Sequence, residues 1–337
     1  MSTQKITSME VAKLAGVSQS AVSRVFTPGA SSSKKTNELV RKAAAELGYR
    51  PNVLARSLIT GKSRMIGLVV AYLDNYFYPE ALELLSSALQ KKGYHVLIFM
   101  SGNKEGDIAE AVDEILDYQV DGIIAASVSM SSDLAKRCTS AGVPVVLFNR
   151  TQDDDRLSAV TSDNFQGGQK VARFLLAGGH KRIGYIAGWE GASTQRDREK
   201  GFTEELVRNG QELYAREVGN FNSDEARQAA RTMFSKKHFP DAVFVANDAM
   251  AIAVIDVIRF ELGLQVPEQV SVVGYDDVPI SSWPAYDLTT VRQPANRMVA
   301  ETVSILIESI ENKTTTARRI EIDGPLMVRG SAKISDK

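Results

Sequence analysis

ITSMEVAKLAGVSQSAVSRVF, residues 6–26, is the stretch that decides how the first part of the chain folds. Thr7 followed three residues later by Glu10 is the pattern of a capping box, and Gly16 suits the left-handed position that ends a helix. A first helix is therefore predicted between these two signals. Its buried side is expected to carry four apolar residues, namely Met9, Val11, Ala12 and Leu14.

A second helix is predicted from Ser18, whose hydroxyl suits the N-cap position. Helical spacing gives it one apolar face, made of Ala21, Val22 and Val25. The opposite face is polar and carries Gln19, Ser20, Ser23 and Arg24.

A third helix is predicted over residues 34–48, after the breaker-rich loop TPGASSS at 27–33, with Ser33 or Thr36 opening it. Its buried side is expected to hold Leu39, Val40, Ala43 and Leu47. Two helices joined by a tight turn containing Gly describe a helix-turn-helix, whose second helix presents its polar face to base edges in the major groove. The alternative is a generic three-helix domain with a hydroxyl-rich surface.

Charge divides the chain in two. Residues 1–64 contain eleven Lys or Arg against three Glu, a net charge of +8, whereas the remainder carries −9. A basic head on an acidic body favours binding to nucleic acid phosphates, and a solvated basic tail is the alternative. A single cysteine, no secretory signal segment and no long apolar run lead us to expect a cytoplasmic protein with no membrane partner.

From residue 65 onward, short β-branched runs alternate with helical stretches. The first set is MIGLVVA, YHVLIFM, DGIIAAS and VPVVLFN, and the second is SAVTS, KRIGYIAG, DAVFVAN and QVSVVGYD. This pattern predicts two open parallel sheets covered by helices on both faces, with ligands beyond the carboxyl ends of the strands. The predicted fold class is an all-α helix-turn-helix head followed by an α/β body of two doubly wound lobes.

Polar residues that follow these strands are the candidates for a ligand site between the lobes. They are Asp74, Asn75, Asn149, Arg150, Arg198, Asn247, Asp248 and Asp276. Aromatic side chains could cover the apolar face of a sugar or belong to the core, namely Tyr72, Phe77, Trp189, Phe221 and Trp283. For Asp163 we favour a helix cap over a ligand contact.

Signatures of enzymes are missing from the sequence. TGKS at 60–63 lacks the preceding glycine of a phosphate loop, because Arg56 stands there, and no HExxH, GxSxG or cysteine pair occurs. The doublet Asp276-Asp277 could be a catalytic pair, but we favour one ligand-binding and one structural carboxylate. We expect no catalytic residues, no metal and no cofactor.

The stretch 6–26 closely resembles the head of the lactose-repressor (LacI/GalR-type) family of bacterial regulators, and LGYRPNVLARSL at 47–58 resembles that family's hinge. Glu10 departs from the Asp usual in the family, with charge and capping role preserved. The resemblance implies that Gln19, Ser20 and Arg24 face bases and that Ser18 and Ser23 contact phosphate. The full set of implied DNA-binding residues is Thr7, Ser18, Gln19, Ser20, Ser23, Arg24, Asn52, Ala55, Arg56 and Leu58.

The hinge also has a physical reading. Pro51 suits a first helical turn, and residues 52–58 are too few for a helix that is stable alone in water. The family pattern implies that Leu58 wedges between base pairs in the minor groove. A plain linker between domains is the alternative.

The resemblance extends over the body, which is similar to a type I periplasmic sugar-binding protein. It implies a head at 1–49, a hinge at 50–64 and an effector-binding and dimerisation domain at 65–337. The chain is expected to cross between lobes near residues 155–160, 291–294 and 322–325. The N-lobe would then hold about 65–158 and 293–322, and the C-lobe about 159–292 and 323–337.

The implied effector-binding residues are Asp74, Phe77, Asn149, Arg198, Asn247 and Asp276. Their carboxylate, amide and guanidinium groups suit the hydroxyls of a sugar, and convergence of Arg150, Arg196 and Arg198 would favour a sugar acid or sugar phosphate. The predicted function is a transcriptional repressor whose affinity for a near-palindromic operator is controlled by such an effector. Because no apolar heptad repeat follows the last strand, a homodimer is expected. A sugar-transport protein and a sugar-metabolising enzyme are the alternatives.

Overall fold

The computed structural model describes residues 6–27, 30–50, 61–71, 73–101, 105–128, 130–152, 156–312 and 316–334, with main chain alone at 105–107. It separates into two units, Met1–Ser63 and Arg64–Lys337. The first is the head and the second is the body, and each is described here by itself. Among the described residues, no helix combines the length and the apolar character needed to cross a bilayer.

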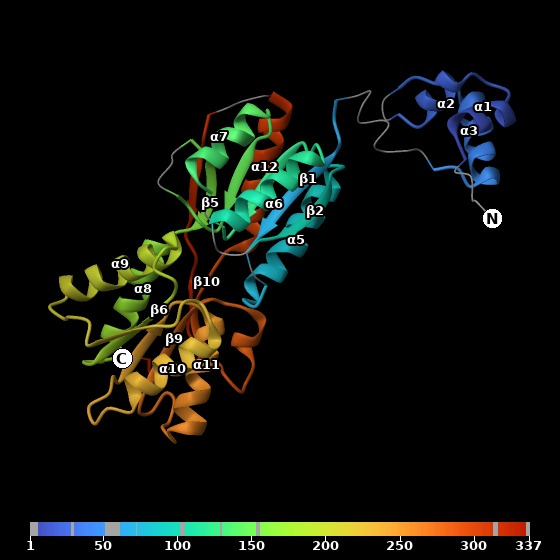
Figure 1. The fold of residues 1–337 in the computed structure, drawn as a ribbon. Coiled ribbons are helices and arrows are strands. Elements are labelled where there is room, and N and C mark those ends of the chain that lie inside the picture. The colour runs from blue at the N-terminus through green and yellow to red at the C-terminus, as the bar shows by residue number, and fades with distance from the viewer. Residues whose placement is uncertain are drawn as a thin grey trace. The chain divides into compact units, whose positions relative to one another are not determined.

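The described part of the head contains three helices, α1 (Ser8–Ala15), α2 (Gln19–Val25) and α3 (Lys34–Leu47) (Figure 1). The predicted capping box is present, because the Thr7 backbone N–H donates to Glu10 Oε2 at 2.7 Å and the Glu10 N–H donates to Thr7 Oγ1. Ser18 caps α2 and Ser33 caps α3. Gly16, with φ of 64°, ends α1 in the left-handed conformation.

The core of the head is smaller than the sequence predicted. Val11, Val22 and Val40 are almost fully buried, surrounded by alanines. Met9, Leu14 and Leu39, predicted to be buried, are instead exposed, with 66%, 47% and 41% of their surface accessible. Because the core is small, each helix contacts it along one narrow row of side chains. Met9, Leu14 and Leu39 lie beside that row.

The body contains two six-stranded sheets. Sheet A has the order β11-β5-β4-β3-β1-β2 and is parallel throughout. Its strands are β1 (Met65–Val70), β2 (His95–Met100), β3 (Gly122–Ala126), β4 (Val145–Phe148), β5 (Ser158–Ser162) and β11 (Arg319–Ile322). Helices α5 (Phe77–Lys91) and α12 (Ala295–Asn312) share one core with the sheet, and α6 (Glu105–Asp117) and α7 (Ser132–Ser140) share another.

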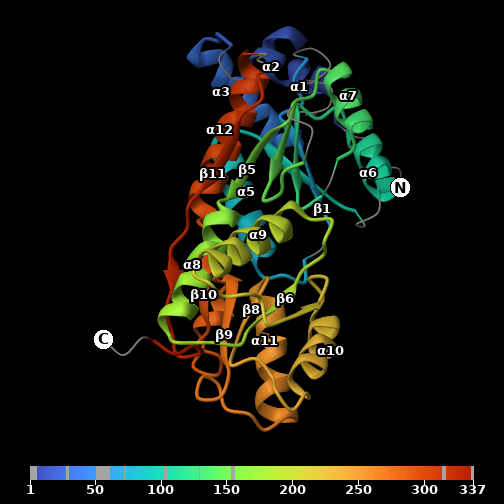
Figure 2. The same ribbon diagram turned by 90° about the vertical axis from the view of Figure 1, so that its left-hand side faces the viewer.

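Sheet B has the order β12-β10-β9-β8-β6-β7, in which only β12 is antiparallel to its neighbour. Its strands are β6 (Ile183–Ala187), β7 (Ala215–Val218), β8 (Ala242–Val245), β9 (Ser271–Asp276), β10 (Thr289–Arg292) and β12 (Leu326–Met327). The covering helices are α8 (Asn164–Ala177), α9 (Ser193–Arg208), α10 (Ser223–Phe234) and α11 (Asp248–Asp256), which the π-helix η1 (Val257–Glu261) extends. Figure 2 shows α8 and α9 on one side of this sheet and α10 and α11 on the other. A short 3-10 helix, η2 (Pro279–Ser282), follows β9.

The expected first crossing near residues 155–160 is wrong, as is the assignment of SAVTS to the second lobe. Those residues form β5, which pairs in parallel with β4 and β11 of sheet A. The sequence of a short strand with polar neighbours does not indicate which sheet the strand joins. Only its pairing with other strands in the folded chain shows this. The chain enters the second lobe after β5, at Asp163, whose side chain caps α8 as we favoured. It returns between β10 and α12 and leaves again after β11.

Helices α8 and α9 cross in close contact at two glycines. A Cβ atom at Gly201 would lie 2.0 Å from the carbonyl oxygen of Phe165, and one at Gly168 would lie 2.2 Å from that of Arg198. No real structure holds such contacts, so any side chain here must push the helices apart. This crossing sets where Arg198 lies at the carboxyl edge of sheet B.

Replacing Gly201 by Ala is therefore expected to destabilise the body by about 2 kcal/mol, in the range of overpacked cores. Thermal unfolding followed by circular dichroism measures the change. Val207→Ala, on the exposed side of the same helix, is the matched control and should change stability by less than about 0.5 kcal/mol. An unchanged melting temperature for Gly201→Ala would show that the helices are free to separate.

Candidate functional site

The polar face of α2 forms the exposed surface of the head. Ser18, Gln19, Ser20, Ser23 and Arg24 are all exposed, opposite the buried valines of the same helix. Gln19 Nε2 donates to Ser8 Oγ at 2.9 Å, and the hydroxyls of Ser18 and Ser20 lie 2.9 Å apart. These contacts hold short donors and acceptors at the surface, where they can meet base edges or phosphates.

Thr7 is exposed, but its hydroxyl donates to Glu10 Oε2 at 2.9 Å within the cap of α1. Its backbone N–H is held by the same carboxylate. The predicted hinge residues Asn52, Ala55, Arg56 and Leu58 lie outside the described residues.

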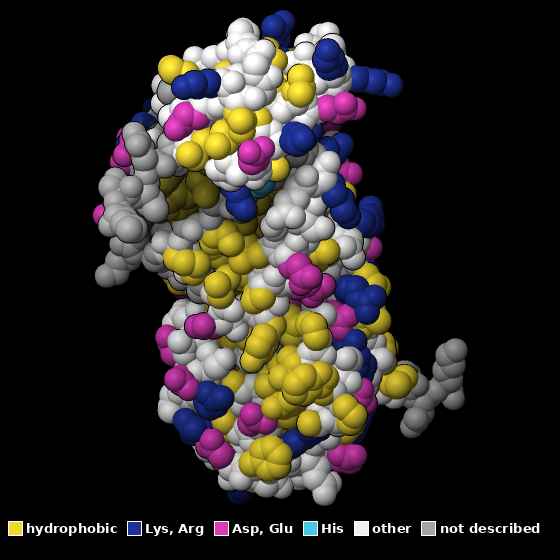
Figure 3. All heavy atoms as spheres, turned by 90° about the vertical axis from the view of Figure 1, so that its right-hand side faces the viewer, with side chains coloured by type: hydrophobic (Ala, Val, Ile, Leu, Met, Phe, Trp, Pro, Cys, Tyr) yellow, Lys and Arg dark blue, Asp and Glu magenta, His cyan; other side chains and the backbone are white. Residues whose placement is uncertain are grey.

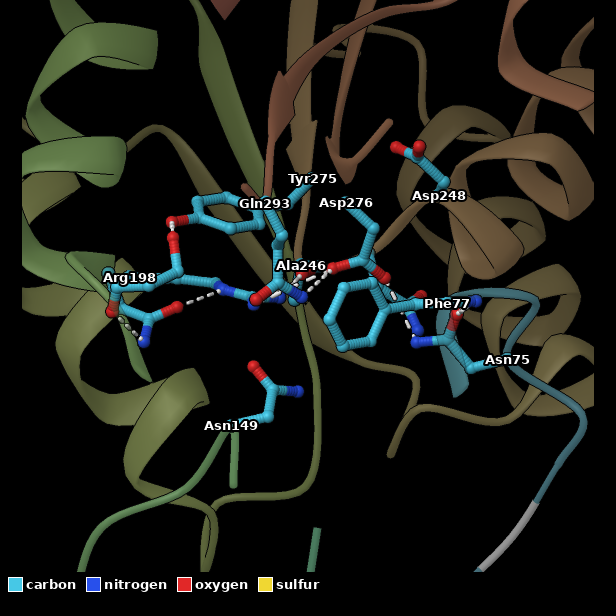
Figure 4. A network of polar contacts seen from close by, with 12 residues as sticks. Asn75, Phe77, Asn149, Arg198, Ala246, Asp248, Tyr275, Asp276 and Gln293 are labelled. Carbon is cyan, nitrogen blue, oxygen red and sulfur yellow. Dashed lines mark hydrogen bonds and ion pairs between the residues drawn. The ribbon is translucent and has the colours of Figure 1, made fainter. Parts of the chain in front are cut away.

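In the body, a network centred on Asp276 occupies the edge where the strands of both lobes end (Figure 4). Asn75, from the first lobe, donates from Nδ2 to Asp276 Oδ2 at 2.9 Å. Gln293, on the crossing segment between β10 and α12, donates to Oδ1 at 2.7 Å. One carboxylate of the second lobe is thus bonded to the first lobe and to a segment that joins the two.

Arg198 supplies the positive charge of this network. Its Nη2 lies 3.6 Å from Asp276 Oδ1, Nε donates to Asn164 Oδ1 at 2.8 Å, and Nη1 donates to the Ala246 carbonyl at 2.6 Å. The guanidinium also stacks over Tyr275, 3.6 Å from the ring centroid. Every face of this buried group is engaged, so its position is fixed. Burial raises the pKa of Asp276, and the Arg198 charge opposes that rise.

Three buried amide atoms near the network have no hydrogen-bond partner among the described residues. They are Asn149 Oδ1, Asn247 Nδ2 and Gln293 Oε1. The other half of each amide is held: Asn149 donates to Tyr78, Asn247 Oδ1 caps α11 through the Met250 N–H, and Gln293 donates to Asp276. Burying such atoms without partners is costly, so they are suited to a polar ligand.

A small cavity of about 10 Å³ lies between the lobes. It is lined by Asn75, Tyr78, Asn149, Arg150, Thr194, Arg198, Phe221 and Asp276. A larger open groove of about 510 Å³ shares Asp276 with it and is bordered by Phe77 and Gln293. Side chains from both lobes therefore converge on one point.

Only some of the predicted effector-binding residues line the cavity. Asn149, Arg198 and Asp276 line the cavity, and Asn247 is buried at the start of α11. Phe77 is buried against Phe148, with ring centroids 6.2 Å apart, and borders only the groove. Asp74 is exposed, and its neighbour Asn75 takes the place in the cavity that was predicted for it.

Among the other candidate arginines and aromatic residues, some also line the cavity and others are exposed. Of the three arginines, Arg150 lines the cavity with its guanidinium 5.5 Å from the Trp189 ring centroid, whereas Arg196 is exposed. Of the remaining aromatics, Phe221 lines the cavity and Trp283 is 55% exposed, while Tyr72 lies outside the described residues.

Sequence reasoning missed Tyr78, Thr194 and Gln293. Tyr78 and Thr194 stand in the first turns of α5 and α9, several residues beyond the ends of the preceding strands β1 and β6. Gln293 lies within the crossing predicted at 291–294, and a polar residue there was the available signal.

Asp277, beside Asp276, does not join the network. It is paired with Arg292 at 2.6 Å and with Arg329 at 2.5 Å. The doublet therefore consists of one carboxylate that lines the cavity and one in a salt bridge that borders only the larger groove. Within the described ranges, no group of three or more His, Cys, Asp or Glu side chains could hold a metal ion.

Comparison with known proteins finds a matching family model for each of the two units. Residues 7–52 match the model described as "Bacterial regulatory proteins, lacI family", and residues 172–332 match a periplasmic binding protein-like domain. The HTH-type transcriptional repressor PurR of Pasteurella multocida is 31% identical over 96% of this chain and 98% of its own length.

Two solved structures resemble the whole chain. The lac repressor dimer bound to operator and the anti-inducer ONPF has a TM-score of 0.88 and 28% identity, over 97% of this chain and 99% of that one. The complex of the transcriptional regulator CelR with cellobiose has a TM-score of 0.73 and 31% identity, over 97% and 100%. With its helix-turn-helix head and its two-lobed ligand-binding body, the chain belongs to the lacI family of bacterial regulatory proteins.

Proposed function

We propose that this DNA-binding transcriptional regulator is a repressor, acting as a homodimer on a near-palindromic operator, and that a sugar-class effector held between its lobes controls operator affinity. The observation that carries the proposal is the Asp276 carboxylate, which is bonded to both lobes at the point where they meet. A ligand that competes for this carboxylate must change how the lobes are joined.

The proposed division of labour follows the predicted domains, a head at 1–49, a hinge at 50–64 and an effector-binding body at 65–337. In the head, Gln19, Ser20 and Arg24 read bases, while Thr7, Ser18 and Ser23 contact the backbone. In the hinge, Asn52, Ala55, Arg56 and Leu58 contact the minor groove. The exposed polar face of α2 supports the first part of this assignment.

The proposed effector site consists of Asn149, Arg198, Asn247 and Asp276, with Asn75 and Gln293 added from the structure. The unpartnered Asn149 and Gln293 oxygens accept hydroxyl protons, and the Asn247 amide donates to a hydroxyl oxygen. CelR is known in complex with cellobiose, a sugar, which supports the same ligand class here. A sugar, a sugar acid and a sugar phosphate all present such hydroxyls, and Arg150 in the cavity lining would favour the two anions.

Control of DNA affinity requires the effector to bind two states of the body unequally. The bond between Asn75 and Asp276 joins the lobes directly, so an effector that occupies Asp276 must replace it. The relative position of the lobes then depends on the ligand, and we propose that the hinge helices form or melt in response.

A second copy of the chain is the proposed partner of the body. Exposed apolar side chains gather on one face of the molecule (Figure 3). Large exposed apolar residues of the body include Tyr76, Ile98, Met100, Phe260 and Trp283. Patches of this kind mark association surfaces, and the lac repressor with the same fold is a dimer on its operator.

We further propose that the chain is not an enzyme and works in the cytoplasm, where bacterial DNA lies. Its relatives are transcriptional regulators. Asp276 is held by Arg198 and two amides, with no base or nucleophile among its bonded partners. The basic head favours a regulator over an exported sugar-transport protein.

A gel-shift experiment tests the proposal. The full chain is mixed with DNA from upstream of its own gene, with and without ribose, cellobiose and a panel of sugar acids and sugar phosphates. A specific shift that one of these compounds strengthens or abolishes is the expected result. Absence of any specific shift under all conditions would overturn the assignment to operator control by this class of effector.

A further inference from the structure

Asp248 is a carboxylate with no accessible surface, placed behind Asp276 on the side away from the cleft (Figure 4). It is the first residue of α11, and three donors meet it. The Val278 N–H and the Ser281 hydroxyl donate to Oδ2 at 3.0 and 2.7 Å, and the Thr290 hydroxyl donates to Oδ1 at 2.6 Å.

These three bonds tie together the segments that carry the effector site. Val278 and Ser281 belong to the segment that follows Asp276, and Thr290 lies on β10, three residues before Gln293. Gly274 of β9 also approaches closely, because a Cβ atom there would lie 2.2 Å from Asp248 Oδ1. Asp248 therefore fixes the chain on both sides of Asp276.

The turn that it holds is strained. Asp276 and Asp277 have φ of 127° and 59°, in the region that residues with side chains rarely adopt. Such a conformation persists only where surrounding contacts impose it, and it is often found at ligand sites. The turn directs one carboxylate to the cleft and the next to Arg292 and Arg329.

The described groups that act on Asp248 are three neutral donors, from β10 and the segment after β9, and the like charge of Asp276 on β9. Burial, reinforced by Asp276, raises the pKa of Asp248 to about 7. Asp276 in contrast lies beside Arg198 and accepts from two amides, surroundings that favour the charged form of Asp276 more than that of Asp248.

We propose that Asp248 is a positioning residue that works as a neutral acid, holding the strained turn that presents the charged Asp276 to the effector. In this form Asp248 Oδ2 accepts from the Val278 N–H and the Ser281 hydroxyl, and the proton on Oδ1 is donated to the Thr290 hydroxyl, which can turn to accept it. The inference rests on the proposed function only in the role that it gives to Asp276.

A pH dependence follows from this arrangement. When folding raises the pKa of a carboxyl group, that group contributes its full stabilisation at pH values below its pKa in the unfolded chain. This stabilisation is lost as the pH rises through the pKa of the group in the folded chain. Above about pH 7, two neighbouring buried carboxylates would both be charged, and their repulsion loosens the turn. The turn should therefore be tighter at pH 6 than at pH 8.

Trp283 provides a reporter, because it directly follows η2, which contains Ser281. The chain has two tryptophans, so Trp189→Phe leaves Trp283 as the single tryptophan, which excitation at the red edge of its absorption selects over the tyrosines. Emission of the full-length Trp189→Phe protein is measured from pH 5.5 to 8.5 without any sugar. We expect a transition with a midpoint near pH 7 that is absent when Asp248→Asn is added, since the amide imitates the protonated acid.

Other groups titrate in the same range, so the difference between parent and variant is the measurement. Asp224→Asn, an exposed carboxylate of α10, is the matched control and should leave the transition in place. Thermal unfolding gives a second readout: the melting temperature of Asp248→Asn relative to the parent should rise from pH 6 to pH 8. Asp248→Ala, which offers no partner to the three donors, should melt lower than Asp248→Asn at both pH values.

A transition that persists unchanged in Asp248→Asn, or its absence from the parent, would overturn the neutral-acid role. Equal melting temperatures of the Asn and Ala variants would overturn the positioning role. Because no sugar is added, these outcomes are independent of the gel shift. A regulator that ignores every sugar could still show the transition, and one that responds to sugar could lack it.

Discussion

Replacing Arg24 by Ala is expected to weaken operator binding on the order of 100-fold or more and to leave effector binding unchanged. Arg24 is exposed on the polar face of α2, beside Ser20 and Ser23. A guanidinium that grips a guanine contributes about 1–3 kcal/mol, and a dimer would lose that contact in both half-sites. The dissociation constant for the operator, measured by fluorescence anisotropy at fixed salt, checks the expectation.

Loss of charge alone must be separated from loss of a specific contact. Lys42→Ala removes one positive charge from the exposed side of α3 and is the matched control. It should weaken specific and non-specific DNA binding by a similar small factor, whereas Arg24→Ala should act mainly on the specific operator. If both variants weakened the operator equally, Arg24 would act only through its charge. If effector binding fell as well, the division into head and body would be wrong.

Replacing Asp276 by Asn is expected to lower effector affinity about 100-fold or more. The carboxylate accepts from Asn75 and Gln293 and neutralises Arg198. The side-chain amide of an asparagine would place its own N–H group against the N–H group of Asn75 or Gln293. It would also leave the buried Arg198 guanidinium without a negatively charged partner. Breaking a buried pair in this way costs about 3–5 kcal/mol.

The operator complex of the variant would thus no longer respond to the effector. Gel shifts across a concentration series of the active compound measure the response, and circular dichroism verifies that the body is folded. Asp277→Asn is the control, because its carboxylate pairs with Arg292 and Arg329 outside the cavity. Effector affinity in this control should change less than about fivefold. An equal loss in both variants would place the effector elsewhere.

Local signals in the sequence predicted the head because its structure depends on neighbours in the chain. The capping pair Thr7 and Glu10, the glycine at 16 and the cap at Ser18 act within three or four residues, and the structure confirms all of them. The alternation of strands and helices likewise predicted two lobes, which the sheets confirm. The residues assigned to contact DNA and effector stay predictions.

What the sequence could not predict depends on packing between distant segments. Met9 and Leu39 are apolar yet exposed, because the size of the core, and not hydrophobicity, decides how many such residues fit. Strand β5 joined the first sheet through partners at 146–148 and 319–322 that no local pattern identifies. The contact between Asn75 and Asp276 spans 201 residues, so only the folded chain shows why Asn75, and not Asp74, reaches the cleft.

Asn247 places a constraint on anyone who wishes to turn this protein into a biosensor for another compound. Its Oδ1 begins α11 by accepting from the Met250 N–H, and its Nδ2 remains for a ligand. A substitution there by a residue that cannot cap, such as Ala or Leu, also removes a helix cap, at about 1 kcal/mol. Libraries that aim at new specificity should keep Asn247 fixed and vary Thr194 and Phe221, which line the cavity between the lobes and are not the N-caps of α9 and α10.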